Sequence, residues 1–191
     1  MVFCKEAPLR VFLPMFFRNS FLLFLAYAVC SAASTSSADN SRPDKLRLRL
    51  YHTHTRERLD IVYRYGQTYV PQALSKLDTF LRDHLTGEIH HFDPRLFDLL
   101  ADLTSAVGRP GAELQIICGY RTPLTNEFLR RTTTGVAKHS LHMEAEAIDI
   151  RLPGTKTSAF RDAALALGRG GVGYYPDSDF IHVDVGPVRR W

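Results

Sequence analysis

The sequence predicts an α+β fold in which a small antiparallel sheet is flanked by helices. Three observations predict it: apolar residues that alternate with polar ones at the start of the folded region, apolar residues at helical spacing after them, and two short strand patterns over 172–175 and 180–185 that follow a Gly-Gly pair. The 191 residues are 45% hydrophobic, 11% aromatic and 23% charged, which is ordinary for one globular domain. This length and composition exclude a multidomain protein and a disordered chain.

The charge balance argues against nucleic acid as a partner. Lys and Arg number 24 against 20 Asp and Glu, a formal net charge of +4, and the basic residues do not cluster. Nucleic-acid binding domains usually carry a larger and more concentrated basic excess. We therefore expect a partner of another kind.

Residues 1–33 are typical of a secretory signal peptide. Lys5, Arg10 and Arg18 precede an apolar run over residues 21–29, and small residues follow at 31–33. The run is shorter than the ~20 residues that cross a bilayer, so no stable membrane span is expected after cleavage. An uncleaved signal anchor is the alternative. A lipid anchor at Cys30 is not expected, because residues 27–29 lack the leucine that usually opens a lipobox.

The first half of the domain predicts a hairpin followed by two helices. Residues 34–44 are polar and without period, which indicates a flexible linker before a domain over 45–191. Apolar residues alternate over 46–51, and a second strand pattern over 59–65 completes an antiparallel hairpin. Helical spacing predicts a helix over 71–85, and Asp93 and Pro94 begin another that runs to Val107 and ends at Gly108.

The second half alternates more quickly between strands and helices. Strands are expected over 113–118 and 147–152, a short helix over 123–131, a polar loop over 132–138, and a helix over 157–167 closed by a glycine. Two short strands over 172–175 and 180–185 follow a Gly-Gly pair. Cys118 lies in an apolar run, so we expect a small buried core residue rather than a reactive thiol.

Two of the predicted strands, over 147–152 and 180–185, bring candidate metal ligands together. Side chains alternate faces along a strand, so Asp149 points away from Ile148 and Ile150, as His182 points away from Ile181 and Val183. If these strands are neighbours, Asp149 and His182 meet, and His142 is close enough in sequence to fold back over them. Two imidazoles and one carboxylate form an open ligand set for catalytic zinc. Spacing alone leaves open that these residues are ordinary surface or hydrogen-bonded groups.

Several motifs, in order, resemble those of the LAS metallopeptidases, the family of D-Ala-D-Ala peptidases and the zinc domain of hedgehog proteins. Its signature S-x-H-x-x-G-x-A-x-D followed by a late histidine is matched by Ser140, His142, Ala147, Asp149 and His182, with Ala145 in place of the glycine. The triplet at 119–121 resembles its S-G-Y-R element. The segments 170–176 and 180–187, with Trp191, are most similar to its murein endopeptidases, and the likeness spans residues 46–191.

The resemblance implies a fold of the hedgehog and D-Ala-D-Ala peptidase kind and a role for each matched residue. His142, Asp149 and His182 would bind Zn²⁺, and Arg121 would hold a substrate carboxylate or carbonyl. Tyr120 and Ser140 would shape the pocket or orient a ligand. Two carboxylates compete for the general base. Asp184 shares a strand face with His182, and its alternative role is to orient that histidine; Asp179 stands where the dipeptidases carry a glutamate.

The function that the resemblance implies is an exported, periplasmic zinc endopeptidase that cuts peptide cross-links of bacterial peptidoglycan. Its partner would be the peptidoglycan peptide, and the protein is expected to be a monomer. Two alternatives stay open: a D,D- or L,D-carboxypeptidase acting on stem peptides, and a zinc-stabilised wall-binding module without turnover. The other histidines are interpreted as surface or locally hydrogen-bonded residues, namely His52, His54, His84, His90, His91 and His139.

Overall fold

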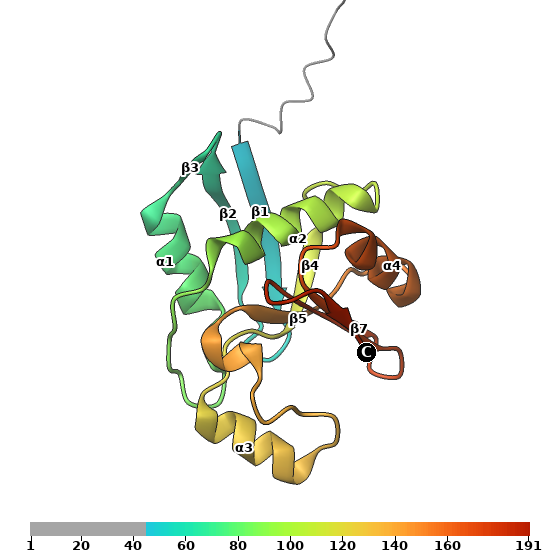
Figure 1. Cartoon of the computed structure of the whole chain (residues 1–191). Helices are drawn as coiled ribbons and strands as arrows, with labels where there is room; N and C mark the ends of the chain where they lie inside the picture. The colour runs from blue at the N-terminus through green and yellow to red at the C-terminus, as the bar shows by residue number, and fades with distance from the viewer. Residues whose placement is uncertain (1–44) are drawn as a thin grey trace, which may run out of the picture. The chain divides into compact units, whose positions relative to one another are not determined.

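The computed structural model describes residues 45–191 (Figure 1). The expected signal peptide over 1–33 and linker over 34–44 lie outside the described residues. The strands are β1 (Lys45–His52), β2 (Arg58–Tyr65), β3 (Thr68–Tyr69), β4 (Glu113–Cys118), β5 (Ala147–Arg151), β6 (Gly171–Tyr175), β7 (Phe180–Asp184) and β8 (Arg189–Arg190). The helices are α1 (Pro71–Phe80), α2 (Pro94–Ala106), α3 (Pro123–Thr132) and α4 (Thr157–Leu167), with a 3₁₀ turn η1 (Leu141–Glu144).

The α+β class is confirmed, but the sheet is larger than expected and mixed. Its eight strands follow the order β3-β2-β1-β4-β5-β7-β6-β8. The predicted β1–β2 hairpin is antiparallel, whereas β1 and β4 run parallel, as do β6 and β8. Parallel neighbours need a crossover connection, and the chain makes one through α1 and α2 between β2 and β4. In Figure 1, α2 lies across the strands on one side of the sheet.

The core lies between the sheet and its helices. Leu48 and Leu50 of β1 are buried, as are Ile148 and Ile150 of β5 and most apolar residues of α2. Cys118 is buried and free, and burial raises the pKa of its thiol to about 12, so the expectation of an unreactive core cysteine is confirmed. Within residues 45–191, no helix combines the length and apolar character needed to cross a membrane.

The first helix ends at Phe80, five residues before its expected end at 85. Asp83 explains the difference, because its carboxylate accepts hydrogen bonds from the N–H groups of Leu85 (2.8 Å) and Thr86 (3.3 Å). These bonds stabilise a turn in place of another helical turn. The same carboxylate accepts from the N–H and hydroxyl of Thr122, at 2.8 and 2.9 Å. Asp83 therefore ties the segment after α1 to the turn after β4.

His52 does not lie at the surface, but the alternative of local hydrogen bonding is confirmed, because its Nδ1 accepts from the N–H groups of His54 (3.3 Å) and Thr55 (3.4 Å). Its ring is fully buried and packs edge-on against Phe80, with ring centroids 5.9 Å apart. Burial lowers the pKa of His52 to about 4. His54 is exposed and stacks on the half-buried ring of His84 at 4.1 Å, while His90, His91 and His139 are exposed, as expected. The end of β1 is covered because the C-terminal end of α1 packs there.

Candidate metal centre

Three side chains from η1, β5 and β7 form a tight triangle. Asp149 and His182 pair directly across the antiparallel β5–β7 ladder, as the alternation predicted. Nδ1 of His182 lies 2.9 Å from Oδ1 of Asp149, and Nε2 of His142 lies 3.1 Å from that nitrogen and 3.2 Å from that oxygen. We call this group the His142–Asp149–His182 triangle.

The spacing of the triangle fits a small tetrahedral cation. Zinc bonds of about 2.0–2.1 Å place neighbouring ligand atoms about 3.3 Å apart, close to the three distances observed. Sγ of Cys118 also lies within 4.8 Å of the ligand atoms of His142 and Asp149. That grouping is wider, and burial raises the pKa of the thiol, so the thiolate that binds metals is costly to form there. The tighter triangle therefore favours His182 over Cys118 as the third ligand.

Backbone atoms fix the orientation of His142. The ring is fully buried, and its Nδ1–H donates to the carbonyl oxygen of Gly119 at 2.7 Å. This bond leaves the lone pair of Nε2 directed into the triangle, as in metal sites where the distal nitrogen of a ligating histidine is held by an acceptor. A Cβ at Gly119 would lie 2.5 Å from the carbonyl oxygen of Leu81, so the close approach requires glycine.

A carboxylate holds His182 from the opposite side. Nε2 of His182 donates to Oδ2 of Asp184 at 3.1 Å, while Nδ1 faces the triangle. Asp184 is fully buried and also accepts from the backbone N–H groups of Gly171 (2.8 Å) and Gly186 (3.0 Å) and from Arg189 (2.7 and 3.1 Å). Burial acts to raise the pKa of Asp184, but these donors lower it to about 2. Asp184 therefore has the contacts of a residue that orients His182.

The charges in the triangle favour a positive occupant. Burial acts to raise the pKa of the Asp149 carboxyl, but His142 and His182 lower it well below its ordinary value. Burial lowers the pKa of His142, whereas at His182 the hydrogen bonds that the ring donates to the Asp149 and Asp184 carboxylates outweigh burial and raise its pKa. The anionic carboxylates thus attract a proton to His182, and a metal cation satisfies the same demand.

The structure places Asp179, the other expected base, in the exposed turn between β6 and β7. Its carboxylate accepts from the Thr157 hydroxyl and lies 3.5 Å from Nη1 of Arg151. Among the described residues, no contact joins Asp179 to the triangle. The two candidates for the general base therefore have different surroundings: Asp184 lies beside the candidate ligand His182, and Asp179 lies in a surface turn.

The expected substrate-binding residues surround the triangle. Arg121 is buried, with Nη2 3.9 Å from Oδ2 of Asp149, and its Nε has no hydrogen-bond partner among the described residues. Ser140 caps η1, where its hydroxyl accepts from the N–H of His142 at 3.4 Å. Ala145 ends η1 with φ of 54°, a left-handed conformation that glycine adopts most easily, which explains why the family motif has glycine there.

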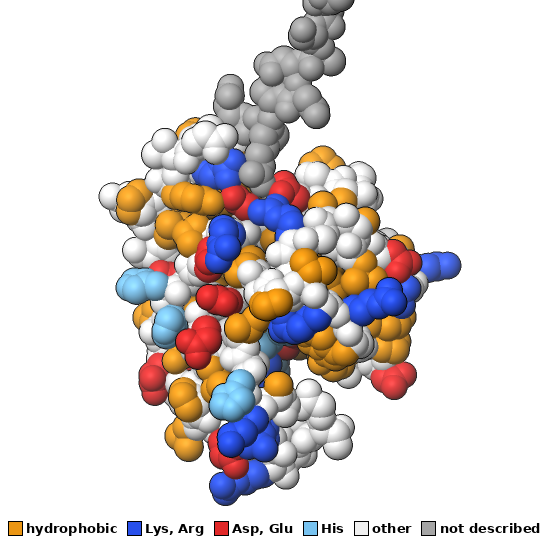
Figure 2. All heavy atoms as spheres, viewed as in Figure 1, with side chains coloured by type: hydrophobic (Ala, Val, Ile, Leu, Met, Phe, Trp, Pro, Cys, Tyr) orange, Lys and Arg blue, Asp and Glu red, His pale blue; other side chains and the backbone are white. Residues whose placement is uncertain are grey.

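A groove of about 450 Å³ opens beside the triangle. Its lining includes His182, Ser140, Leu141 and Trp191, with residues of the loop that precedes η1. A second hollow of about 330 Å³ lies on the other side of His139, lined by Tyr120, Glu144 and residues of α3. These hollows give an extended ligand access to both sides of η1. On the face of the molecule in Figure 2, basic and acidic side chains are interspersed.

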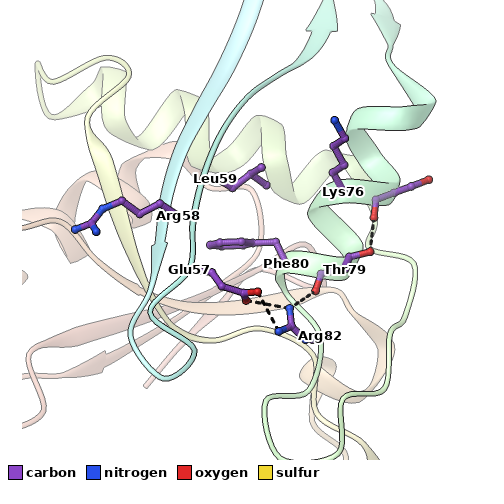
Figure 3. A pocket seen from close by; sticks show the side chains of 8 residues that line it. Glu57, Arg58, Leu59, Lys76, Thr79, Phe80 and Arg82 are labelled. Carbon is purple, nitrogen blue, oxygen red and sulfur yellow. Dashed lines mark hydrogen bonds and ion pairs between the residues drawn. The ribbon is translucent and has the colours of Figure 1, made fainter.

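Another hollow, of about 500 Å³, lies between β2 and α1 (Figure 3). Phe80 and Leu59 provide its apolar surface, and Arg82 is paired with Glu57 at 3.0 Å. None of its lining residues belongs to the triangle or contacts it. We therefore place the candidate site at the triangle and not in this hollow.

The comparisons with known proteins agree with the motifs. A peptidase family model described as peptidoglycan L,D-endopeptidase MepK matches residues 40–191. The chain belongs to this family. The expected likeness to the murein endopeptidases among the LAS peptidases is thereby confirmed.

Curated relatives in the MepK family match the chain over 151 residues. A protein of Haemophilus influenzae named "Probable peptidoglycan L,D-endopeptidase MepK" is 42% identical, covering 79% of this chain and 81% of the relative. Proteins of Escherichia coli K12 and Shigella flexneri named "Peptidoglycan L,D-endopeptidase MepK" are each 41% identical, covering 79% of this chain and 82% of each relative. No solved structure matches the chain.

Sequence reasoning missed three groups that support the triangle: the Gly119 carbonyl, Asp83 and Arg189. The first is a backbone atom and leaves no side-chain signal. Asp83 acts on the turn at 119–122 from 39 residues away in sequence. Arg189 lies in the two-residue strand β8, whose parallel pairing with β6 no local pattern indicates. Only the glycine in the 119–121 motif could have pointed to the close approach there.

Proposed function

We propose that this chain is a zinc-dependent L,D-endopeptidase that hydrolyses peptide cross-links of peptidoglycan. The observation that carries the proposal is the His142–Asp149–His182 triangle, whose ligand atoms are spaced for one tetrahedral ion. The names of the curated relatives supply the substrate class and the L,D specificity. Residues 1–33 would export the chain to the periplasm, 34–44 would be a linker, and 45–191 a monomeric peptidase domain.

Zinc suits this ligand set. Two imidazoles and one carboxylate leave a tetrahedral ion one open position, the arrangement of catalytic rather than structural zinc. Bound there, zinc supplies Lewis-acid polarisation of the scissile carbonyl and activation of water as the nucleophile.

The protein's own residues would position the reactants. The Gly119 carbonyl holds His142 and the Asp184 carboxylate holds His182, so both rings are presented in one orientation. Arg121 would hold an anionic group of the substrate, which is supported by its Nε having no hydrogen-bond partner within residues 45–191. Asp184 and Asp179 are both candidates for the general base, and the contacts of Asp184 support an orienting role instead.

The test is hydrolysis of defined cross-linked muropeptides by the zinc-loaded full chain. L,D- and D,D-cross-linked dimers are incubated separately and the products followed by mass, beside His182→Ala and, as a matched control, the exposed His54→Ala. We expect zinc-dependent conversion of L,D-linked dimers to monomers, lost in His182→Ala together with bound zinc and retained in His54→Ala.

Other results would select the alternatives. Release of a terminal amino acid from stem peptides with dimers intact would indicate a carboxypeptidase. Zinc-dependent thermal stabilisation without any product would indicate a wall-binding module. Full activity of His182→Ala would refute the assignment of the triangle.

A further inference from the structure

Trp191 lies beside the triangle, although it is remote from His142 and Asp149 in sequence. Its indole centroid is 5.1 Å from the centroid of the His182 imidazole, and it lines the same groove as His182. The side chain is half-exposed, at 51%. A large aromatic surface is therefore open to a ligand next to the candidate metal centre.

The indole is exposed but firmly held. The N–H of Trp191 donates to the carbonyl of Val172 at 3.2 Å, and its carbonyl accepts from the N–H of Tyr174 at 3.1 Å. Its Nε1–H donates to the hydroxyl of Tyr175 at 2.9 Å. A residue held by two main-chain hydrogen bonds and one from its ring loses little conformational freedom when a ligand packs on it, which is a property of aromatic binding residues.

Strand β6 leaves space for the indole at the position that faces His182. Gly173 pairs with His182 in the β6–β7 ladder, and a Cβ at Gly173 would lie 2.7–2.9 Å from atoms of the indole. Any larger residue would push the ring away from His182. The absence of a side chain at Gly173 thus sets the distance between Trp191 and the candidate ligand.

The chemistry of the groove indicates which part of a substrate it takes. Val136, Ala137, Leu141 and Trp191 give it apolar walls. Arg189, its charged member, is already paired with Asp184 at 2.7 Å. The groove therefore suits an uncharged, aliphatic stretch of peptide, which can pack on an indole face through its methylene and peptide groups. The stem carboxylates would be held elsewhere, for example by Arg121.

We propose that Trp191 is a substrate-binding residue whose indole packs against the peptide stem of peptidoglycan beside the scissile bond. The inference rests on the proposed function, because the occupant of the groove is the substrate of that same site. It also predicts that Tyr175 positions the indole through the hydrogen bond to Nε1.

Steady-state kinetics on the zinc-loaded full chain with an L,D-cross-linked muropeptide dimer test the role. We expect Trp191→Ala to raise KM about tenfold, as for loss of a well-packed aromatic contact, with kcat within about twofold and zinc content unchanged. Trp191→Phe, which keeps an aromatic face, should recover most of the KM. Tyr175→Phe should raise KM about twofold to threefold, since the ring stays but loses an anchor. Val188→Ala, at an exposed neighbour outside the groove lining, should match the wild type.

Fluorescence supplies a readout that does not depend on turnover. Trp191 is the single tryptophan of the chain, so all indole emission reports on this ring. Titration with an uncross-linked stem-peptide muropeptide should shift the emission to shorter wavelength and saturate. A normal KM in Trp191→Ala, or a fall in kcat alone, would overturn the proposal, as would emission that does not respond to the peptide. If the wild type cleaves no dimer, the proposed function fails, and the titration alone decides whether the groove binds the stem.

Discussion

Asp184→Asn distinguishes an orienting carboxylate from a general base. The substitution keeps the shape of the side chain and removes its charge. Asp184 accepts hydrogen bonds from four groups: the N–H groups of Gly171 and Gly186, Nε2–H of His182 and the guanidinium of Arg189. An amide would place its own NH₂ against at least one of these donors, so one contact becomes repulsive.

The expected magnitudes follow from these contacts. Loss of the partner that orients a ligating histidine typically weakens metal affinity or activity 10–100-fold, about 1.4–2.7 kcal/mol. Breaking a fully buried ion pair costs about 3–5 kcal/mol, but the Arg189 side chain is 41% exposed, and solvent screens the pair. We therefore expect the free energy of unfolding of Asp184→Asn to fall by about 2 kcal/mol.

The assay combines zinc affinity, from competition with a chelator, and kcat measured at saturating zinc. Asp184→Asn should bind zinc 10–100-fold more weakly and recover kcat to within about tenfold when zinc is saturating. Asp179→Asn, at the other candidate base, serves as the control and should bind zinc normally. Wild-type zinc affinity in Asp184→Asn combined with a fall in kcat of about 1,000-fold would make Asp184 the general base and refute the orienting role.

Three further predictions concern the scaffold. Asp83→Ala should lower the free energy of unfolding, measured by urea denaturation, by about 2–4 kcal/mol, because the N–H groups of Leu85 and Thr122 lose a buried acceptor. Asp177→Ala, at an exposed position, should change this free energy little, and equal losses in the two variants would contradict the explanation. His52 has a folded-state pKa of about 4, below its ordinary value, so the unfolded chain binds the proton first as the pH falls. The free energy of unfolding should therefore fall by up to about 3 kcal/mol as the pH drops from about 6.5 to about 4. His52→Gln should remove the contribution of His52 to this loss between pH 7 and 4.5, and an identical pH dependence in both proteins would count against the explanation. Cys118, with its pKa raised to about 12, should resist thiol reagents in a chain with Cys4 and Cys30 replaced by serine until denaturant is added; rapid labelling of the folded protein would show that the thiol is accessible.

The sequence predicts the triangle because strand alternation is a local and strict rule. Placing Asp149 and His182 opposite each other required only two short strands of the right phase that pair as neighbours. The expectation that His142 folds back over Asp149 also needed nothing beyond a short loop. Features of this kind depend on a few adjacent residues, so one sequence contains the information.

Features that depend on distant pairing were not predictable in the same way. The parallel β1–β4 contact is created by packing of two intervening helices, so alternation alone suggested a smaller antiparallel sheet. Alternation placed Asp184 on the face of His182 but could not say which ring nitrogen it would contact. His52 continues the polar stretch of the hairpin end in sequence, and only the position of Phe80 shows that its ring is covered.

The two histidines of the triangle differ in how far mutation can adjust them. His142 is held by a carbonyl of the main chain at Gly119, where Leu81 excludes any larger residue, so no single side-chain replacement offers that ring a different acceptor. His182 is held by a side chain, which can become an amide, a glutamate or an apolar group. Natural drift or laboratory selection that tunes the centre should therefore accumulate changes around His182 and leave the surroundings of His142 nearly invariant.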